Sequence, residues 1–234
     1  RCNSHCQHCQ IGEEQRVSRP AAIDRALAVD VVRRIAEVYA PRSVMTFGGE
    51  PLLFPDTVCA IHKTARDCSI AQREVITNGG LPRAEAGFRT VAEKLAASGV
   101  NRVLISVDAF HQEYIPLPVV ERNIRALLAV GIEQVLLNPC WVVGREHDNV
   151  WNRRTQAILG ALAHLPVSES EGNVVQPAGY ARSTLREFLP PRVPLPAGAC
   201  GDLPYTGRLD EVTSITLEPD GGVAVCDGFV IGNA

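Results

Sequence analysis

The 234-residue sequence lacks the features that mark several broad classes of protein. It has no apolar run near the roughly 20 residues that a membrane-spanning helix needs, so we expect no membrane partner. It has no surplus of positive charge either. Its 23 Lys and Arg against 26 Asp and Glu leave a net charge of -3, so composition gives no argument for a nucleic-acid partner. The hydrophobic content of 46% is typical of a globular protein with a full core.

Cysteine is present, but it is not arranged as in a small secreted scaffold. Eight cysteines in a chain of this length argue against a disulfide framework, which belongs to short extracellular domains. We therefore expect a reducing, cytoplasmic setting in which some cysteines bind metal. The sequence starts without Met inside a cysteine-rich loop and stops with no closing element. We expect a fragment that lacks a strand before Cys2 and a tail after Ala234.

The first nine residues carry a dense group of metal-ligating side chains. Cys2, Cys6 and Cys9 form a C-x-x-x-C-x-x-C run, whose thiolates can face one metal centre from a single loop. A structural zinc site wants four protein ligands, so one alternative is a zinc site completed by His5 or His8. The other is a cubane iron–sulfur cluster with one iron left open, because cysteine thiolates at short spacings hold such clusters.

Helical and strand patterns alternate after this loop. The first four visible strands recur roughly every thirty residues, the length of one βα unit. This alternation predicts an α/β fold with a parallel sheet and right-handed crossovers. Five visible strands plus one before Cys2 suggest a six-unit partial barrel. Helices are expected near 22–39, 56–67, 84–98, 117–130 and 150–165, and strands near 43–47, 74–76, 102–108, 134–138 and 173–176.

Polar residues stand where these strands end, which is where parallel α/β folds bind ligands. The first strand runs into Gly48-Gly49-Glu50-Pro51, whose glycines let the backbone approach a ligand and whose Glu50 presents a carboxylate. The alternative is a tight turn with a solvated Glu. Candidates at the next three strand ends are Asn78, Ser106, Asp108 and Asn138. Ser106 and Asp108 point to one face, although capping of the next helix is a common alternative.

The cysteine run followed by Gly-Gly-Glu-Pro after a strand resembles the radical S-adenosylmethionine (SAM) superfamily. That family's signature is C-x-x-x-C-x-aromatic-C, with His8 in the aromatic slot here. The resemblance covers residues 1 to about 182 and implies a partial TIM-like (β/α)6 barrel. It also implies a 4Fe-4S cluster on Cys2, Cys6 and Cys9 whose fourth iron SAM chelates. The implied SAM-binding residues are His8, Gly48, Gly49, Glu50, Asn78, Ser106, Asp108, Asn138 and Arg182.

Within that resemblance, two segments have more specific expectations. Gly-Gly-Glu-Pro would hold the SAM amino group, and Gln176 to Arg182 looks like the family's Pro-x-Gly-x-Ala segment, with Arg182 near the SAM carboxylate. The loop 108–114 is polar and aromatic, and its place above the barrel mouth makes it a substrate-facing candidate. The alternative is that its Phe110 and Tyr114 pack as core.

The last 45 residues read differently from the rest. A Pro- and Gly-rich stretch from 190 to 204 predicts a linker, and Glu218 to Gly221 between two β-prone runs predicts a hairpin. We therefore divide the chain into a core (1–189) and a linker with the start of a second module (190–234). Cys200 and Cys226 there resemble the first half of a SPASM or twitch module, which would hold an auxiliary iron–sulfur cluster. Two isolated buried cysteines are the alternative, and we interpret Cys59, Cys68 and Cys140 in that way.

The resemblance implies an enzyme in which the reduced cluster cleaves SAM to a 5′-deoxyadenosyl radical that takes hydrogen from a substrate. An auxiliary module favours a peptide or protein substrate. Cluster reduction implies an electron donor such as ferredoxin or flavodoxin. Two alternatives remain: a zinc-binding interaction module, and a radical SAM-like scaffold without catalysis.

Overall fold

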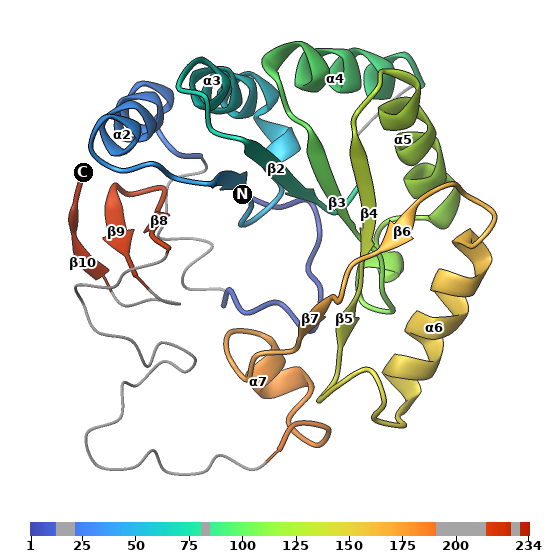
Figure 1. Cartoon of the computed structure of the whole chain (residues 1–234). Coiled ribbons are helices and arrows are strands. Elements are labelled where there is room, and N and C mark those ends of the chain that lie inside the picture. Colours follow the sequence, from blue (N-terminus) through green and yellow to red (C-terminus); the bar gives the residue numbers. More distant parts are fainter. Residues whose placement is uncertain (13–21, 81–84, 191–213, 226–229) are drawn as a thin grey trace.

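The computed structural model describes residues 1–12, 22–80, 85–190, 214–225 and 230–234. At its centre is a five-stranded parallel sheet in the order β1-β2-β3-β4-β6. The strands are β1 (Ser43–Thr46), β2 (Gln72–Thr77), β3 (Arg102–Ser106), β4 (Gln134–Asn138) and β6 (Ser168–Glu169). Figure 1 shows the sheet curving through an arc with the main helices along its outer side. The fold is therefore the predicted α/β partial barrel.

The outer helices follow the predicted alternation. They are α2 (Arg25–Val38), α3 (Pro55–Asp67), α4 (Glu85–Ser98), α5 (Leu117–Ala129) and α6 (Val150–Leu162). Helix α2 begins three residues later than expected because Asp24 caps it, its carboxylate accepting from the Leu27 N–H at 2.8 Å. None of the described helices is long and apolar enough to span a membrane.

The core lies between the sheet and this helical layer. On β3, Val103 and Ile105 are fully buried, and they belong to one cluster with Leu95 of α4 and Ile124 of α5. Burial on both faces explains why β3 reads as a continuous apolar run and not as an alternating one. This packing fixes the strands, and the strands in turn fix the loops at their carboxyl ends.

The fifth strand of the sheet is a correction to the sequence-based prediction. The predicted strand near 173–176 is present as β7 (Asn173–Val174), but it pairs with β5 (Cys140–Trp141) in a separate two-stranded sheet. The fifth strand of the main sheet is β6, which pairs with β4. Pro139 separates β4 from β5, because it has no N–H to donate to a strand ladder. The polar run 168–171 carries no apolar alternation that would have identified β6.

The C-terminal residues form a small antiparallel sheet of β8 (Thr216–Leu217), β9 (Gly222–Ala224) and β10 (Val230–Asn233). The predicted hairpin is confirmed. Its turn is closed by the Glu218 N–H, which donates to the Gly222 carbonyl at 2.8 Å. A third strand joins this hairpin, since β10 pairs with β9. Cys200, Cys226 and the predicted linker lie outside the described residues, so the module boundary at 190 stays a prediction.

Candidate active site

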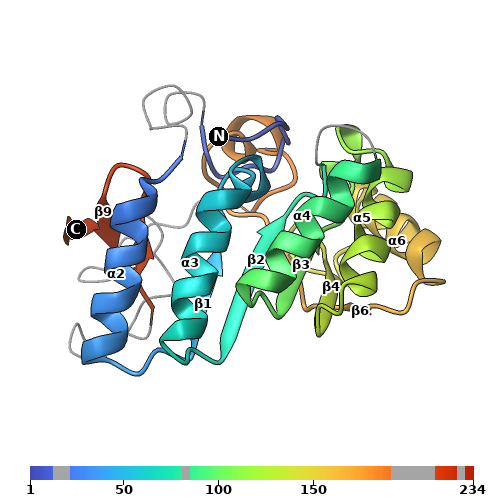
Figure 2. The same cartoon turned by 90° about the horizontal axis from the view of Figure 1, so that it is seen from above.

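The cysteine loop (residues 1–10) lies at the carboxyl edge of the sheet, the same edge as the short helix α7 (Ala181–Thr184; Figure 2). Cys6 is buried, whereas Cys2 and Cys9 are partly exposed. A turn within the loop is closed by the Cys9 N–H, which donates to the Cys6 carbonyl at 3.1 Å. Burial raises the pKa of the Cys6 thiol, and the nearby Asp108 carboxylate raises it further. Without a metal ion this thiol stays protonated at neutral pH.

The Gly-Gly-Glu-Pro turn after β1 holds the start of this loop. The Glu50 N–H donates to the Arg1 carbonyl at 2.8 Å. A Cβ on Gly49 would lie 2.3 Å from that same carbonyl oxygen, so only glycine permits the approach. Gly48 has a φ of +122°, a conformation that disfavours other residues. Gly49 therefore lets the turn contact the cysteine loop, a partner that the sequence did not indicate.

Glu50 is not a solvated turn residue. Its side chain is almost fully buried, and its carboxylate accepts from the Leu52 N–H at 2.9 Å, the Thr77 hydroxyl at 2.8 Å and the Asn78 N–H at 2.7 Å. Burial raises the pKa of Glu50, and these hydrogen bonds oppose the rise. Because a carboxylate has about four lone-pair sites, it retains capacity for one further donor. Glu50 thus ties the end of β1 to the end of β2.

Asn78 links the end of β2 to the cysteine loop. Its side-chain amide donates to the Asn3 side chain at 2.7 Å and lies 3.9 Å from the Cys2 sulfur, within range of a weak N–H···S bond. Its side-chain oxygen accepts from the Gly80 N–H at 2.8 Å. Asn78 was predicted to face the ligand, and the structure places it beside the first cysteine.

The second half of the loop rests on the segment before α7. A Cβ on Gly179 would lie 2.3 Å from the Gln10 carbonyl carbon and oxygen, and the Tyr180 N–H donates to the Cys9 carbonyl at 2.9 Å. The Pro-x-Gly-x-Ala segment is therefore at the predicted edge. Arg182, by contrast, is exposed and makes no ion pair with the described residues. The structure does not bring it to the buried part of the site.

Ser106 and Asn138 lie opposite each other at the ends of β3 and β4, and both are buried. Asn138 accepts from the Ser170 hydroxyl at 2.7 Å. Asp108 is fully buried and caps the following turn, η2 (His111–Glu113): one oxygen accepts from the Phe110 N–H at 3.0 Å and the His111 N–H at 2.9 Å. These two backbone hydrogen bonds of Asp108 fit the capping alternative.

Asp108 and His111 also form a buried pair, with the second carboxylate oxygen 2.8 Å from Nδ1 of His111. Burial alone would raise the pKa of Asp108, but His111 outweighs it and lowers this pKa to about 2. Burial would lower the pKa of His111, but the Asp108 charge raises it overall. Sequence analysis did not single out His111, although a His three residues after a strand-end Asp is the signal that could have found it.

The loop 108–114 and His8 pack on each other. The His8 ring stacks on Phe110 with centroids 4.6 Å apart, and Phe110 stacks on Trp151 of α6 at 4.7 Å. Burial lowers the pKa of His8 to about 4. Phe110 is fully buried, so it packs as core, whereas the more exposed Tyr114 donates from its hydroxyl to the His5 carbonyl at 3.0 Å. Phe110 therefore does not face a substrate, and the polar residues of the loop stay the substrate-facing candidates.

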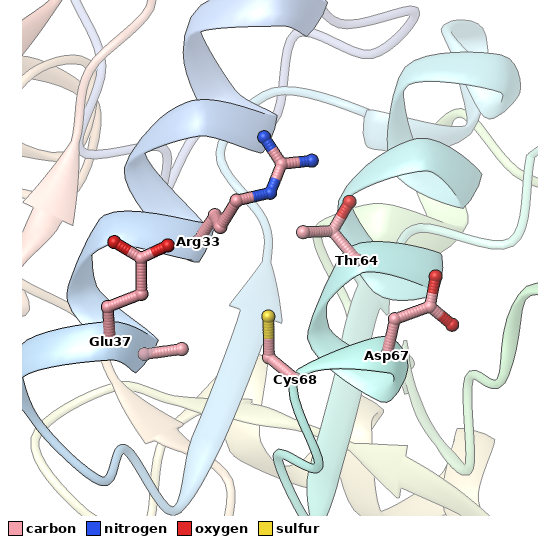
Figure 3. Close-up of a pocket in the computed structure, with 6 residues that line it drawn as sticks. Arg33, Glu37, Thr64, Asp67 and Cys68 are labelled. Atoms are coloured by element: carbon pink, nitrogen blue, oxygen red, sulfur yellow. The ribbon is translucent and has the colours of Figure 1, made fainter.

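A separate hollow of about 410 Å³ lies between α2 and α3, at the opposite edge of the sheet (Figure 3). Arg33 and Glu37 of α2 line one wall, and Thr64, Asp67 and Cys68 line the other. It is distant from the cysteine loop, and the polar groups of its wall are solvated. We place the candidate active site at the carboxyl edge, where the polar groups are buried.

Comparisons with known proteins agree on the family. A family model described as the Radical SAM superfamily matches residues 1–139. A GTP 3',8-cyclase of Cyanothece sp. (strain PCC 7425) is 30% identical over 112 residues, which are 47% of this chain and 32% of that protein. GTP 3',8-cyclase 2 of Pseudomonas aeruginosa is 24% identical over 172 residues, 69% of this chain and 49% of that protein. The chain spans about half or less of these relatives' length.

Two solved structures share the fold. The [FeFe]-hydrogenase maturase HydG has a TM-score of 0.54 at 15% identity, covering 80% of this chain and 43% of that one. Coproporphyrinogen III oxidase (HemN) from Escherichia coli, described as a radical SAM enzyme, has a TM-score of 0.51 at 13% identity, covering 84% and 47%. The family match spans more than half of the sequence, and the cysteine run and the Gly-Gly-Glu-Pro turn both fall inside it. The chain therefore belongs to the radical SAM superfamily, whose cofactors are a 4Fe-4S cluster and SAM.

Proposed function

We propose that Cys2, Cys6 and Cys9 hold the cluster and that the carboxyl edge of β1 to β4 binds SAM beside it. The observation that carries this proposal is the fastening of the cysteine loop to that edge. Glu50 holds its start, Asn78 its first half and Tyr180 its end. A loop held by contacts from three segments that are far apart in the sequence suits three ligands that must meet one metal centre.

The donor set fits the family's cluster. It consists of three thiols from one loop, the ligand type that iron–sulfur clusters use. Cys6 lies in an apolar group with Phe110, Val142 and Leu185, which limits access of water, and the Asn78 amide near the Cys2 sulfur is the kind of contact that tunes such clusters. When bound, the cluster supplies the electron that breaks a carbon–sulfur bond of SAM, and the resulting deoxyadenosyl radical takes hydrogen from the substrate.

Different buried groups around this edge would bind different parts of SAM. The free acceptor capacity of Glu50 suits the methionine amino group, with Gly48 and Gly49 allowing close backbone approach. Ser106 and Asn138 present polar side chains at adjacent strand ends, Asn78 and Asp108 complete the polar rim, and His8 stands in the aromatic slot. Arg182 is the weakest member of this set, since it is exposed and would have to reach the SAM carboxylate from α7.

The first test is anaerobic reconstitution of the protein with iron and sulfide, followed by reduction in the presence of SAM. We expect a brown protein with roughly four irons per cluster, and formation of 5′-deoxyadenosine. Glu50→Gln should weaken SAM binding without loss of iron, whereas the exposed control Glu93→Gln should change neither. If protein that has first been stripped of metal still assembles no cluster and binds one zinc instead, the interaction-module alternative is favoured. A cluster without SAM cleavage would favour the scaffold.

The substrate proposal is a peptide or protein, supported by the resemblance of Cys200 and Cys226 to an auxiliary-cluster module. A second candidate is GTP, because the curated relatives reported above carry the name GTP 3',8-cyclase. Incubating the reconstituted enzyme with GTP and SAM, and analysing products by mass spectrometry, separates them. A product isomeric with GTP or derived from it would overturn the peptide proposal.

The electron donor is proposed to be a small low-potential protein of the ferredoxin or flavodoxin class. The same SAM-cleavage assay tests it, with reduced ferredoxin or flavodoxin in place of a chemical reductant. Deoxyadenosine formation with the chemical reductant but with neither protein would contradict this part of the proposal alone.

A further inference from the structure

A second potential ligand set shares one residue with the cysteine loop. Cys6, His8 and His111 each offer a ligand atom, and these atoms all lie within 4.8 Å of one another. Donors at 2.0–2.3 Å from a tetrahedral ion stand roughly 3.3–3.8 Å apart, so a shift of about 1 Å would bring the three atoms around one ion. One thiolate and two imidazoles are the ligands that zinc-class ions prefer.

His111 is held as metal-ligating histidines usually are. Its Nδ1 bonds the buried Asp108 carboxylate at 2.8 Å, which leaves Nε2 as the nitrogen available to an ion. The other oxygen of Asp108 is fixed by the backbone N–H groups of Phe110 and His111. Such carboxylate–histidine pairs set the tautomer and the direction of the ring in metal sites.

His8 provides an independent observation. Its Nδ1 is buried and has no hydrogen-bond partner among the described residues. Leaving such a group unsatisfied costs free energy, so it calls for an explanation. The ring is held in place by its stack on Phe110 and by its edge contact with His111, whose centroid is 4.8 Å away. An ion bound by Nδ1 of His8 would give this buried nitrogen the partner that it lacks.

We propose that Cys6, His8 and His111, backed by Asp108, form a mononuclear site for a divalent cation of the zinc class. Three protein ligands leave one coordination position for water. Cys6 cannot bind this ion and the iron–sulfur cluster at the same time, so the site is filled only when the cluster is absent. This mutual exclusion is the one part of the inference that rests on the proposed function. Zinc at this site therefore blocks cluster assembly.

The test is an anaerobic titration of the metal-free protein with Co²⁺, a coloured substitute for Zn²⁺. We expect one ion per chain with a thiolate-to-cobalt charge-transfer band, displaced by Zn²⁺. Cys2→Ser/Cys9→Ser should keep this spectrum. His111→Phe and His111→Gln should each lose it, and Asp108→Asn should weaken binding 10- to 100-fold, as outer-shell carboxylate changes do. The exposed control His164→Phe should bind as the native protein does.

Cluster reconstitution of the same variants separates this proposal from the proposed function. Cys2→Ser/Cys9→Ser should fail to assemble the cluster while binding Co²⁺, and His111→Gln should do the reverse. Far-UV circular dichroism confirms folding of each variant. Unchanged Co²⁺ binding in both His111 variants, or loss of binding in Cys2→Ser/Cys9→Ser, would overturn the mononuclear site. A native protein that binds Co²⁺ as described but assembles no cluster would overturn the proposed function and leave this site standing.

Discussion

The two edges of the sheet contain similar residues in very different settings. At the carboxyl edge, Cys6, Glu50 and Asp108 are all buried, and each carboxylate accepts at least two backbone N–H groups. At the opposite edge, Cys68 and Asp67 line an open hollow (Figure 3), and Asp67 pairs with Lys63 at 2.6 Å across a helix turn, with both side chains at least half exposed. Exposed pairs of this kind contribute at most about 1 kcal/mol.

This difference shows why the hollow between α2 and α3 is not the better candidate site. A binding site needs polar groups whose positions are set before the ligand arrives, and burial with backbone hydrogen bonds sets them. Side chains exposed to solvent do not have their positions fixed in this way. The presence of a cysteine and a carboxylate is therefore uninformative until their burial and partners are known.

The strongest way to test the comparison is to remove one thiol from each edge. Cys6→Ser should abolish the cluster on the cysteine loop, lowering iron by roughly four per chain, because three ligands are the minimum for this centre. Cys68→Ser should leave iron unchanged. Iron analysis after anaerobic reconstitution measures both, and equal loss in the two variants would contradict the assignment.

A carboxylate can be removed from each edge in the same way. Glu50→Ala leaves the Leu52 N–H, the Thr77 hydroxyl and the Asn78 N–H without their buried acceptor. At about 1 kcal/mol or more for each orphaned donor, the free energy of unfolding should fall by about 3 kcal/mol. Asp67→Ala should change it by less than about 0.5 kcal/mol. Urea denaturation of the metal-free protein distinguishes them, and a near-neutral Glu50→Ala would mean that water replaces the carboxylate.

Replacing a glycine should also have opposite effects on stability at the cysteine loop and in an outer helix. Gly49→Ala brings a methyl group against the Arg1 carbonyl, so we expect a loss of about 2 kcal/mol and a displaced cysteine loop. At Gly160, inside α6, a Cβ meets nothing within 4 Å, and Gly160→Ala should stabilise the protein by up to about 1 kcal/mol. Thermal unfolding reports both signs. Stabilisation by Gly49→Ala would show that the loop does not rest on the turn.

His62 of α3 lies between the two edges, and its burial predicts a pH dependence of the free energy of unfolding. Its side chain is fully buried, with Nε2 3.0 Å from the Thr46 hydroxyl, and burial followed by the Arg73 charge lowers its pKa to about 4. Its unfolded-state pKa is near 6.5, so the unfolded chain binds the extra proton between these values. Stability should therefore fall as pH drops from 6.5 toward 4, and His62 alone should account for roughly 2 kcal/mol of the loss at pH 5. The buried His8, whose pKa is also lowered to about 4, adds to the loss in the same window. His62→Gln should reduce the slope by the share of His62, and an unchanged slope would assign all of it to other groups.

The sequence determined the frame of the molecule. Apolar runs with β-prone residues specified β1 to β4, and helical periodicity specified α2 to α6, because both signals are local and are read from neighbouring residues. The spacing of Cys2, Cys6 and Cys9 and the Gly-Gly-Glu-Pro turn identified the family for the same reason. Family membership then implied the cofactors, whereas the roles of individual residues remain proposals.

Only the tertiary structure decided which of these residues meet. Asn78 reaches Asn3 across 75 positions, Gly179 abuts Gln10, and His111 comes beside Cys6. β6 joined the sheet without any apolar pattern of its own, through pairing with β4. These contacts depend on how parallel strands and their crossovers bring distant chain segments to one edge. No local pattern encodes such a meeting, because the free energy that fixes it comes from packing between segments that are far apart in the sequence.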